Sequence, residues 1–188
     1  MNKVIIVDEN DRIVKFENKE RAHKGNGMLH RAILVMVFNK KEILLARRSR
    51  YKKLWPLFWD GSCASHPLPN ETYLQCAKRR LKEELGIKCK LLKYLFKFKY
   101  KAIYKNIGTE NEICKVFICN YNGDIQPNKK GVSEIKWESI NKLKNHIKKN
   151  SNKYTPWFKI AFTYLKTQSA KCPLQRSEAR PALLLEQK

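Results

Sequence analysis

Apolar and polar residues alternate in the first third of the chain in short runs that are typical of β-strands. Residues 3–7 and 13–16 are predicted to form a hairpin, because the residues between them, 8–11, are Asp, Glu, Asn and Asp. Residues 32–38 and 42–46 form a second such pair around an Asn-Lys turn. The pattern therefore predicts antiparallel strands at the start of the chain.

A helical pattern replaces the alternation over residues 70–85, where apolar residues recur at spacings of three and four. Gly86 is a typical C-terminal stop for such a helix. The aromatic segment 55–59, which is bracketed by Pro56 and Gly61, is predicted to be a loop that runs into a strand. The apolar residues of the helix are Leu74, Ala77, Leu81 and Leu85.

The second half of the chain returns to strands at residues 91–104 and 112–121 and then to helices at 139–149 and 156–167. Strands mixed with a few helices predict an α+β or mixed α/β sandwich. The folded domain is expected to span residues 1–167, because residues 168–188 lose the Lys/Asn bias and are richer in Ala, Pro, Gln and Arg. We expect this tail to be disordered or an extension added to the domain.

Composition adds a strong positive charge to this picture. The 188 residues contain 40 Lys and Arg against 17 Asp and Glu, which gives a net charge of +23, while 43% are hydrophobic. The hydrophobic content is sufficient for a core and excludes a disordered basic protein. The longest apolar run, residues 33–38, is far shorter than the ~20 residues of a membrane span. Acidic residues near the start also argue against a signal peptide, so we expect a cytoplasmic protein without a transmembrane segment.

Charge alone leaves the partner open between nucleic acid, an anionic membrane and a small polyanion such as a diphosphate. An unspecific Lys-rich surface is a fourth interpretation, because the lysines are spread over the whole chain. The six cysteines include no CxxC pair, so we expect free thiols in a reducing compartment rather than a disulfide framework.

Several residues of metal-ligating type could come together. His23 and His30 flank the loop Lys-Gly-Asn-Gly, which could fold back and bring the two rings to one point. Glu110 and Glu112 are two residues apart in a predicted strand and would share a face. With His66, these side chains would suit a divalent ion such as Mn, Zn or Fe. His146 stands alone on a Lys-rich helix and is expected to have no role in this site.

The predicted helix carries the sequence ETYLQCAKRRLKEELGI, which is similar to the Nudix box GX5EX7REUXEEXGU, where U is aliphatic. Ser65 stands at the leading Gly of the box, and Arg80 replaces the first Glu of its REUXEE run. Carboxylates of that run gather Mg ions around a diphosphate, so Arg80 disfavours hydrolysis but not diphosphate binding. The matching residues are Arg79, Leu81, Glu83, Glu84, Gly86 and Ile87.

Over approximately residues 3–165 the chain resembles the type I isopentenyl-diphosphate isomerases. The matching segments are HKGNGMLHRA, LLARRSRYKKLWP, SHP, RRLKEELG, GTENEIC and TPW, in this order. The resemblance implies a Nudix fold, with a mixed β-sheet sandwiched between helices. It also implies a metal-dependent enzyme that converts isopentenyl to dimethylallyl diphosphate by protonating and deprotonating the alkene.

The resemblance assigns roles to individual residues. Glu112 with Tyr100 would protonate the alkene, and Trp157 would cover the resulting cation with its π-face. Glu84 would hold a Mg²⁺ shared with the diphosphate. The ligands of a second metal, Mn²⁺ or Zn²⁺, would be His23, His30, His66, Glu110 and Glu112. The cations on the diphosphate would be Lys19, Arg48, Lys52 and Arg80.

Ala64 is the one break in this pattern, because the family places a cysteine there, on the substrate face opposite Glu112. Cys63 is one residue out of register and is expected to point away from the pocket as a buried thiol. An alanine exchanges no proton, so ordinary isomerase activity is expected to be severely reduced. Three explanations are open: an introduced substitution, rescue by Cys63 or water, or a scaffold used for another reaction.

The sequence thus favours an isomerase-family enzyme that acts on a prenyl diphosphate. The enzymatic alternative is a cyclisation of a longer prenyl diphosphate that begins with protonation and needs no opposing thiol. A Nudix diphosphate hydrolase and a basic nucleic-acid-binding module rank below both, and no nucleic acid is expected as a partner.

Overall fold

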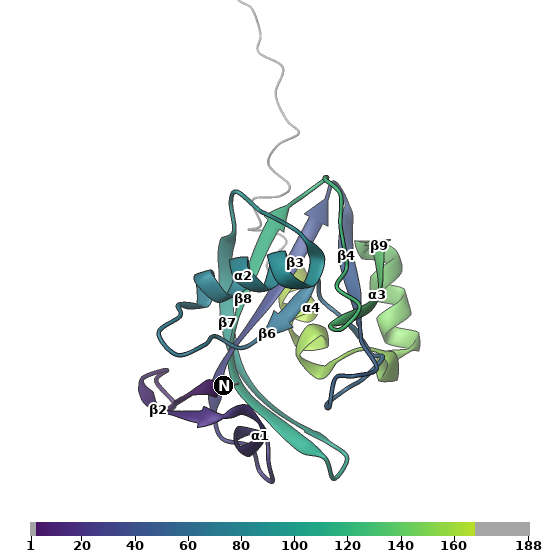
Figure 1. Ribbon diagram of the computed structural model, residues 1–188. Helices are drawn as coiled ribbons and strands as arrows, with labels where there is room; N and C mark the ends of the chain where they lie inside the picture. The colour runs from purple at the N-terminus through teal and green to yellow at the C-terminus, as the bar shows by residue number, and fades with distance from the viewer. Residues whose placement is uncertain (1–2, 168–188) are drawn as a thin grey trace, which may run out of the picture.

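The computed structural model describes residues 3–167, which form one mixed β-sheet with helices on both of its faces (Figure 1). The expected tail, residues 168–188, lies outside the described residues. The helices are α1 (Lys19–Ala22), α2 (Tyr73–Leu85), α3 (Ile140–Lys149) and α4 (Pro156–Thr167), with a 3₁₀ turn at Ser151–Lys153. The strands are β1 (Lys3–Val7), β2 (Ile13–Asn18), β3 (His30–Asn39), β4 (Glu42–Arg48), β5 (Trp59–Asp60), β6 (Cys63–Ser65), β7 (Lys93–Tyr104), β8 (Gly108–Asn120) and β9 (Val132–Ser139).

Strand β3 is the centre of the sheet. On one side it pairs in parallel with β8 along almost its whole length, from His30↔Glu112 to Phe38↔Asn120. On its other side it pairs successively with β1, β6 and β4, and its pairing with β4 is confined to two residue pairs at the turn. Because β4 then diverges from β3, a gap opens in the sheet, and β6 fills it.

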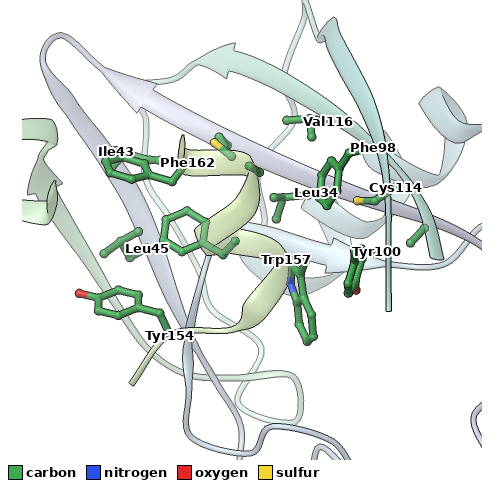
Figure 2. Close-up of a cluster of buried hydrophobic side chains, with 14 of the residues drawn as sticks. Leu34, Ile43, Leu45, Phe98, Tyr100, Cys114, Val116, Tyr154, Trp157 and Phe162 are labelled. Carbon is green, nitrogen blue, oxygen red and sulfur yellow. The ribbon is translucent and has the colours of Figure 1, made fainter. Parts of the chain in front are cut away.

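Two hydrophobic clusters cover the two faces of the sheet. The even-numbered residues of β3, such as Leu34 and Met36, pack with Phe158 of α4 (Figure 2). The odd-numbered residues, such as Val35, pack with Leu81 of α2 on the opposite face. Helix α2 begins at the capping residue Thr72 and ends at Gly86, whose φ of 71° is a left-handed conformation that suits glycine. In the described part of the chain, no helix is long and apolar enough to span a membrane.

The predicted strands and helices are present, with ends that move by a few residues. The pattern missed the short elements α1 and β6 and the longer strand β9. It was wrong about Leu74, whose side chain is 39% exposed. Helix α2 buries the adjacent Tyr73 instead. Arg31 and Lys115 cover the Tyr73 ring, and the Tyr73 hydroxyl donates a hydrogen bond to Asp11.

Candidate functional site

Five potential metal ligands meet at one end of the sheet. Their ligand atoms all lie within 4.8 Å of one another. The pairing of β3 with β8 sets His30 directly beside Glu112, and the glycine-containing loop after α1 brings the His23 ring to 4.6 Å from the His30 ring. The sequence prediction of a converging His/Glu cluster is therefore correct. The members are His23, His30, His66, Glu110 and Glu112.

The hydrogen bonds of the imidazoles show that this cluster is suited to a cation. The Nδ1–H groups of His23 and His30 donate to the carbonyls of Lys19 and Met28, at 2.5 and 2.7 Å. Each Nε2 therefore carries a lone pair, and neither has a hydrogen-bond partner although both are buried. Oε2 of Glu110 lies 2.8 Å from the Nε2 of His23 and is also unpartnered. Imidazole nitrogens and carboxylate oxygens that converge without hydrogen-bond partners fit a bound metal ion.

A pocket of about 220 Å³ lies next to the cluster. On its floor the Tyr100 hydroxyl donates to Oε2 of Glu112 at 2.5 Å. Burial and the neighbouring charge of Glu112 raise the pKa of Tyr100 well above its usual value, so the phenol keeps its proton. The indole of Trp157 stands 6.0 Å from the Tyr100 ring, between centroids, and forms an aromatic wall (Figure 2). Glu112 thus lines a small pocket together with the aromatic side chains of Tyr100 and Trp157.

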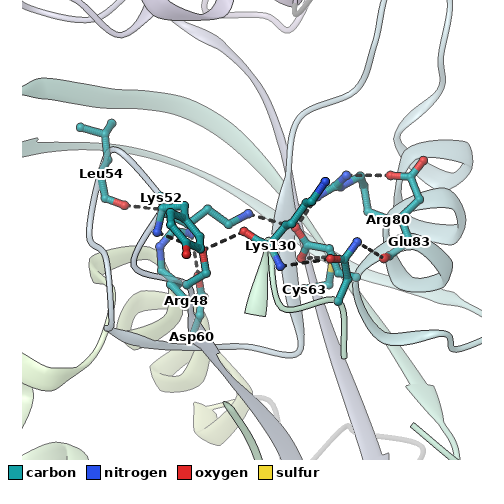
Figure 3. Close-up of polar contacts among 12 residues, drawn as sticks. Arg48, Lys52, Leu54, Asp60, Cys63, Arg80, Glu83 and Lys130 are labelled. Carbon is teal, nitrogen blue, oxygen red and sulfur yellow. Dashed lines mark hydrogen bonds and ion pairs between the residues drawn. The ribbon is translucent and has the colours of Figure 1, made fainter. Parts of the chain in front are cut away.

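Six cationic residues line the same pocket, Lys3 and Arg79 among them. The other four are the cations predicted to bind the diphosphate: Lys19, Arg48, Lys52 and Arg80. Arg48 is fixed by hydrogen bonds to the carbonyls of Trp55 and Leu54, at 2.9 and 2.8 Å (Figure 3). Burial and the nearby cations lower the pKa of Lys19. Cations that converge on one pocket can bind an anion, and guanidinium groups suit phosphate oxygens.

Glu84 contacts two of these cations and lies outside the His/Glu cluster. Its Oε1 accepts from Lys52 at 3.0 Å and from Arg80, and its Oε2 accepts from the Cys63 thiol at 3.4 Å (Figure 3). Although burial opposes ionisation, Lys52 and Arg80 hold the pKa of Glu84 below its usual value. The carboxylate is therefore an anchor that orients two pocket cations.

Ala64 and Cys63 lie on opposite faces of β6. Ala64 pairs with Leu34 and lines the pocket, whereas Cys63 pairs with Val35 and packs against the α2 side of the sheet. Burial and the charge of Glu84 raise the pKa of the Cys63 thiol well above its usual value. The expectation that Cys63 points away from the pocket is correct.

Sequence reasoning missed Asp60, a buried carboxylate behind the aromatic wall. Its Oδ1 and Oδ2 lie 2.9 and 3.0 Å from Nε1 of Trp157, and its Oδ2 lies 3.4 Å from the Arg48 guanidinium. Burial raises the pKa of Asp60 to about 6. Only its position between the aromatic segment and a glycine set Asp60 apart in the sequence, and that signal did not indicate a role.

Two further predictions concern residues around the site. His146 lies outside the cluster, where its Nδ1 is 2.7 Å from the Tyr154 hydroxyl, as expected for a residue without a role in the site. Cys114 is buried, as expected, but it also lines the pocket beside Tyr100. Arg79, from the Nudix-like segment, forms two 2.7 Å hydrogen bonds to Glu71 and so fixes the start of α2.

Known proteins define the class to which this fold and site belong. The sequence matches the NUDIX domain over residues 28–158. A MutT protein from Methanosarcina mazei shares the fold, with a TM-score of 0.60 and 20% identity over 77% of this chain and 96% of its own. A Deinococcus radiodurans protein of known crystal structure has a TM-score of 0.64 at 20% identity, over 77% of this chain and 88% of its own. The chain is a Nudix-domain protein.

Sequence relatives narrow the class to one family of enzymes. Isopentenyl-diphosphate Delta-isomerase 1 of Photorhabdus laumondii is 40% identical over 85% of this chain and 92% of its own length. The isopentenyl-diphosphate Delta-isomerase of Haloarcula marismortui is 35% identical over 84% of this chain and 88% of its own length. The chain belongs to the isopentenyl-diphosphate Delta-isomerase family, which confirms the family and the Nudix fold predicted from sequence.

Proposed function

We propose that the protein interconverts isopentenyl and dimethylallyl diphosphate. One observation carries this proposal: the hydrogen-bonded pair of Glu112 and Tyr100 faces an aromatic space that adjoins four cations. Such a site can bind a diphosphate at one end while an acid acts on a hydrocarbon at the other. The name of the family supports the same substrate.

We further propose that the His/Glu cluster holds Mn²⁺ or Zn²⁺. The mixed imidazole and carboxylate donors suit either ion, and the unpartnered Nε2 atoms of His23 and His30 supply their lone pairs. A bound cation would neutralise the clustered carboxylates and make a carboxyl group among them a stronger acid. Glu84 would take part in binding a Mg²⁺ that is shared with the diphosphate, once Lys52 and Arg80 turn to the phosphate oxygens.

The size of the pocket favours a short substrate. Lys19, Arg48, Lys52 and Arg80 would hold the diphosphate, which leaves the space between Trp157 and Tyr100 for the hydrocarbon. The pocket volume of about 220 Å³ lies below the ~300–1,000 Å³ typical of drug-sized ligands. A five-carbon diphosphate fits this space, whereas a chain of fifteen or twenty carbons would have to extend into the pocket of about 800 Å³ that shares Lys19, Arg48 and Lys52.

The proposed chemistry moves two protons. Glu112, oriented by Tyr100, delivers a proton to the terminal alkene carbon, and the π electron pair forms the new C–H bond. The indole face of Trp157 stabilises the tertiary cation that remains. A water molecule at the Ala64 face, or the thiolate of an Ala64→Cys variant, takes a proton from the carbon two bonds from the phosphate oxygen, and the C–H electron pair forms the new double bond while the diphosphate is unchanged.

Ala64 supports a second candidate function. In the pocket wall, the Ala64 side chain offers no group that takes up the second proton. A longer prenyl diphosphate could instead quench its cation with an internal double bond, so that protonation by Glu112 starts a cyclisation. Hydrolysis ranks below both reactions, because the guanidinium of Arg80 stands where the Nudix box has a carboxylate.

Deuterated buffer separates these functions. The chain and its Ala64→Cys variant are incubated with diphosphates of five, ten, fifteen and twenty carbons in the presence of Mn²⁺ and Mg²⁺. We expect deuterium to enter the five-carbon substrate, and we expect Ala64→Cys to raise that rate by about 100-fold, as a positioned acid or base does. A cyclised product from a longer chain would replace the isomerase proposal, and phosphate release alone would indicate a hydrolase.

A cytoplasmic location is also part of the proposal. It is supported by the five cysteines of the described residues, Cys63, Cys76, Cys89, Cys114 and Cys119, all of which are free thiols.

A further inference from the structure

Asp60 is buried directly behind the aromatic wall of the pocket. Its side chain belongs to a residue that is only 3% exposed, at the end of the two-residue strand β5. Both carboxylate oxygens lie within 3.0 Å of the Trp157 Nε1, and the backbone N–H of Gly61 donates to Oδ1 at 2.8 Å. The carboxylate therefore holds the edge of the indole ring whose face lines the pocket.

Holding the indole with a buried charged group costs free energy, because the charge is removed from water. A neutral amide in the same place could accept the same Nε1–H hydrogen bond without the cost of burying a charge. Burial raises the pKa of Asp60 only to about 6, so the carboxylate is ionised at neutral pH in spite of that cost. The negative charge itself therefore has a use that a hydrogen-bond acceptor alone would not serve.

The negative charge of Asp60 has a second effect, because it balances the positive charge of Arg48. Its guanidinium carbon lies 5.1 Å from the centre of the Trp157 ring, and its NH1 is 3.4 Å from Oδ2 of Asp60. Without Asp60, the positive charge of Arg48 over the Trp157 ring would be unbalanced and would repel a cation on the pocket side of the ring. With Asp60, the charge of Arg48 is balanced, and the indole gains electron density because its N–H donates to a carboxylate.

We propose that Asp60 is a positioning residue that makes the Trp157 wall of the pocket selective for positively charged hydrocarbon groups. This role deepens the proposed function, because a cation forms next to Trp157 only if an alkene is protonated there. Asp60 acts through Trp157 and Arg48 and does not itself contact the substrate.

Two stable diphosphates test this role without turnover. Both are bound to the full chain in the presence of Mn²⁺ and Mg²⁺ and measured by calorimetry. One carries a dimethylammonium group on a two-carbon arm, and the other is the uncharged 3-methylbutyl diphosphate of similar shape. We expect Asp60→Asn to weaken the ammonium ligand about tenfold, in line with a desolvated cation–π contact, and to change the neutral ligand less than twofold.

Glu134→Gln is the matched control, because it removes a carboxylate that pairs with the adjacent Arg47 on the exposed surface at 3.3 Å. We expect this variant to change the affinity of neither ligand. If Asp60→Asn does not fold, Asp60→Ser removes the same charge with a smaller side chain and should likewise lower the preference for the ammonium ligand.

Equal weakening of both ligands would show that Asp60 only supports the shape of the pocket, and it would overturn the inference while the proposed function stands. An unchanged preference in Asp60→Asn would do the same. If neither diphosphate binds the unaltered chain, the proposed function fails together with the inference.

Discussion

At the scale of single residues, two buried carboxylates show how partners decide protonation. Lys52 and Arg80 both contact Glu84, and although burial opposes ionisation they keep the pKa of Glu84 below its usual value. Asp60 has a single cation, Arg48, at 3.4 Å, and its burial dominates, so its pKa rises to about 6. The first carboxylate stabilises the fold in its charged form, whereas the second is charged at the expense of stability.

This difference predicts a pH-dependent stability for Asp60→Asn. In the unfolded chain the pKa of Asp60 is near 3.8, so between about pH 4 and 6 the folded state binds more protons than the unfolded state. The contribution of Asp60 to stability is therefore present at low pH and is lost as the pH rises through about 6. A shift of this size corresponds to about 3 kcal/mol.

Urea unfolding of both proteins at pH 4 and pH 7 measures the effect. We expect the stability of Asp60→Asn relative to the unaltered chain to improve by up to about 3 kcal/mol between the two pH values. Asp124→Asn, an exposed position, controls for the removal of one negative charge. A constant difference between Asp60→Asn and the unaltered chain would show that folding does not change the pKa of Asp60.

At the scale of elements, the divergence of β3 and β4 leaves backbone groups that need other hydrogen-bond partners. Strand β6 fills part of the gap by pairing with residues 33–35 of β3. Just before β6, the Ser62 hydroxyl accepts from the Val37 N–H at 2.8 Å and donates to the Leu44 carbonyl at 2.7 Å. One fully buried side chain thus joins two strands whose own pairing has ended.

Replacing this bridge should weaken the sheet beside the site. Ser62→Ala leaves a buried N–H and a buried carbonyl without their partner, which costs about 1–3 kcal/mol. We expect chemical denaturation to show this loss, while Ser151→Ala, at an exposed hydroxyl, should change stability by less than about 0.5 kcal/mol. Equal stability of the two variants would mean that water replaces the Ser62 hydroxyl.

At the scale of the whole molecule, the His/Glu cluster joins segments that are far apart in the chain. His23 follows α1, His30 begins β3, His66 follows β6, and the two glutamates lie in β8. Each segment pairs or packs elsewhere in the sheet, so a cation bound among the five side chains would link most of the domain. Stability should then depend on the metal, because only the folded chain assembles the ligands.

Thermal unfolding with and without a divalent ion tests this dependence. We expect Mn²⁺ or Zn²⁺ at 100 times its Kd to add about 2.7 kcal/mol, and a chelator to reverse the gain. His30→Gln should lose the response, whereas His146→Gln, outside the cluster, should keep it. An equal response in both variants would place the bound ion at another site.

The positions of the lysines in the whole molecule explain part of the overall positive charge. Strand β7 pairs only with β8 among the described strands, so it is an edge of the sheet. Its exposed residues include Lys97, Lys99 and Lys101, and lysines on an edge strand prevent further strand pairing. Only a few of the cations, those of the pocket, are placed where a diphosphate would bind.

The sequence by itself determined most of the elements and identified the side chains that meet in the His/Glu cluster. Apolar periodicity located the main strands and α2, because side chains repeat every two residues in a strand and at spacings of three and four in a helix. The alternation of faces also placed Cys63 away from the pocket and Glu110 and Glu112 together. These are local rules, so they can be read from neighbouring residues.

Only the tertiary structure decided which residues from distant parts of the chain lie in contact. The register of β3 with β8 sets His30 beside Glu112, and the packing of α4 sets Trp157 against Asp60, 97 residues away in sequence. The exposure of Leu74 and the burial of Tyr73 likewise depend on where α2 contacts the sheet. Such contacts depend on long-range packing, and for that reason the role of Asp60 had no signature in the sequence.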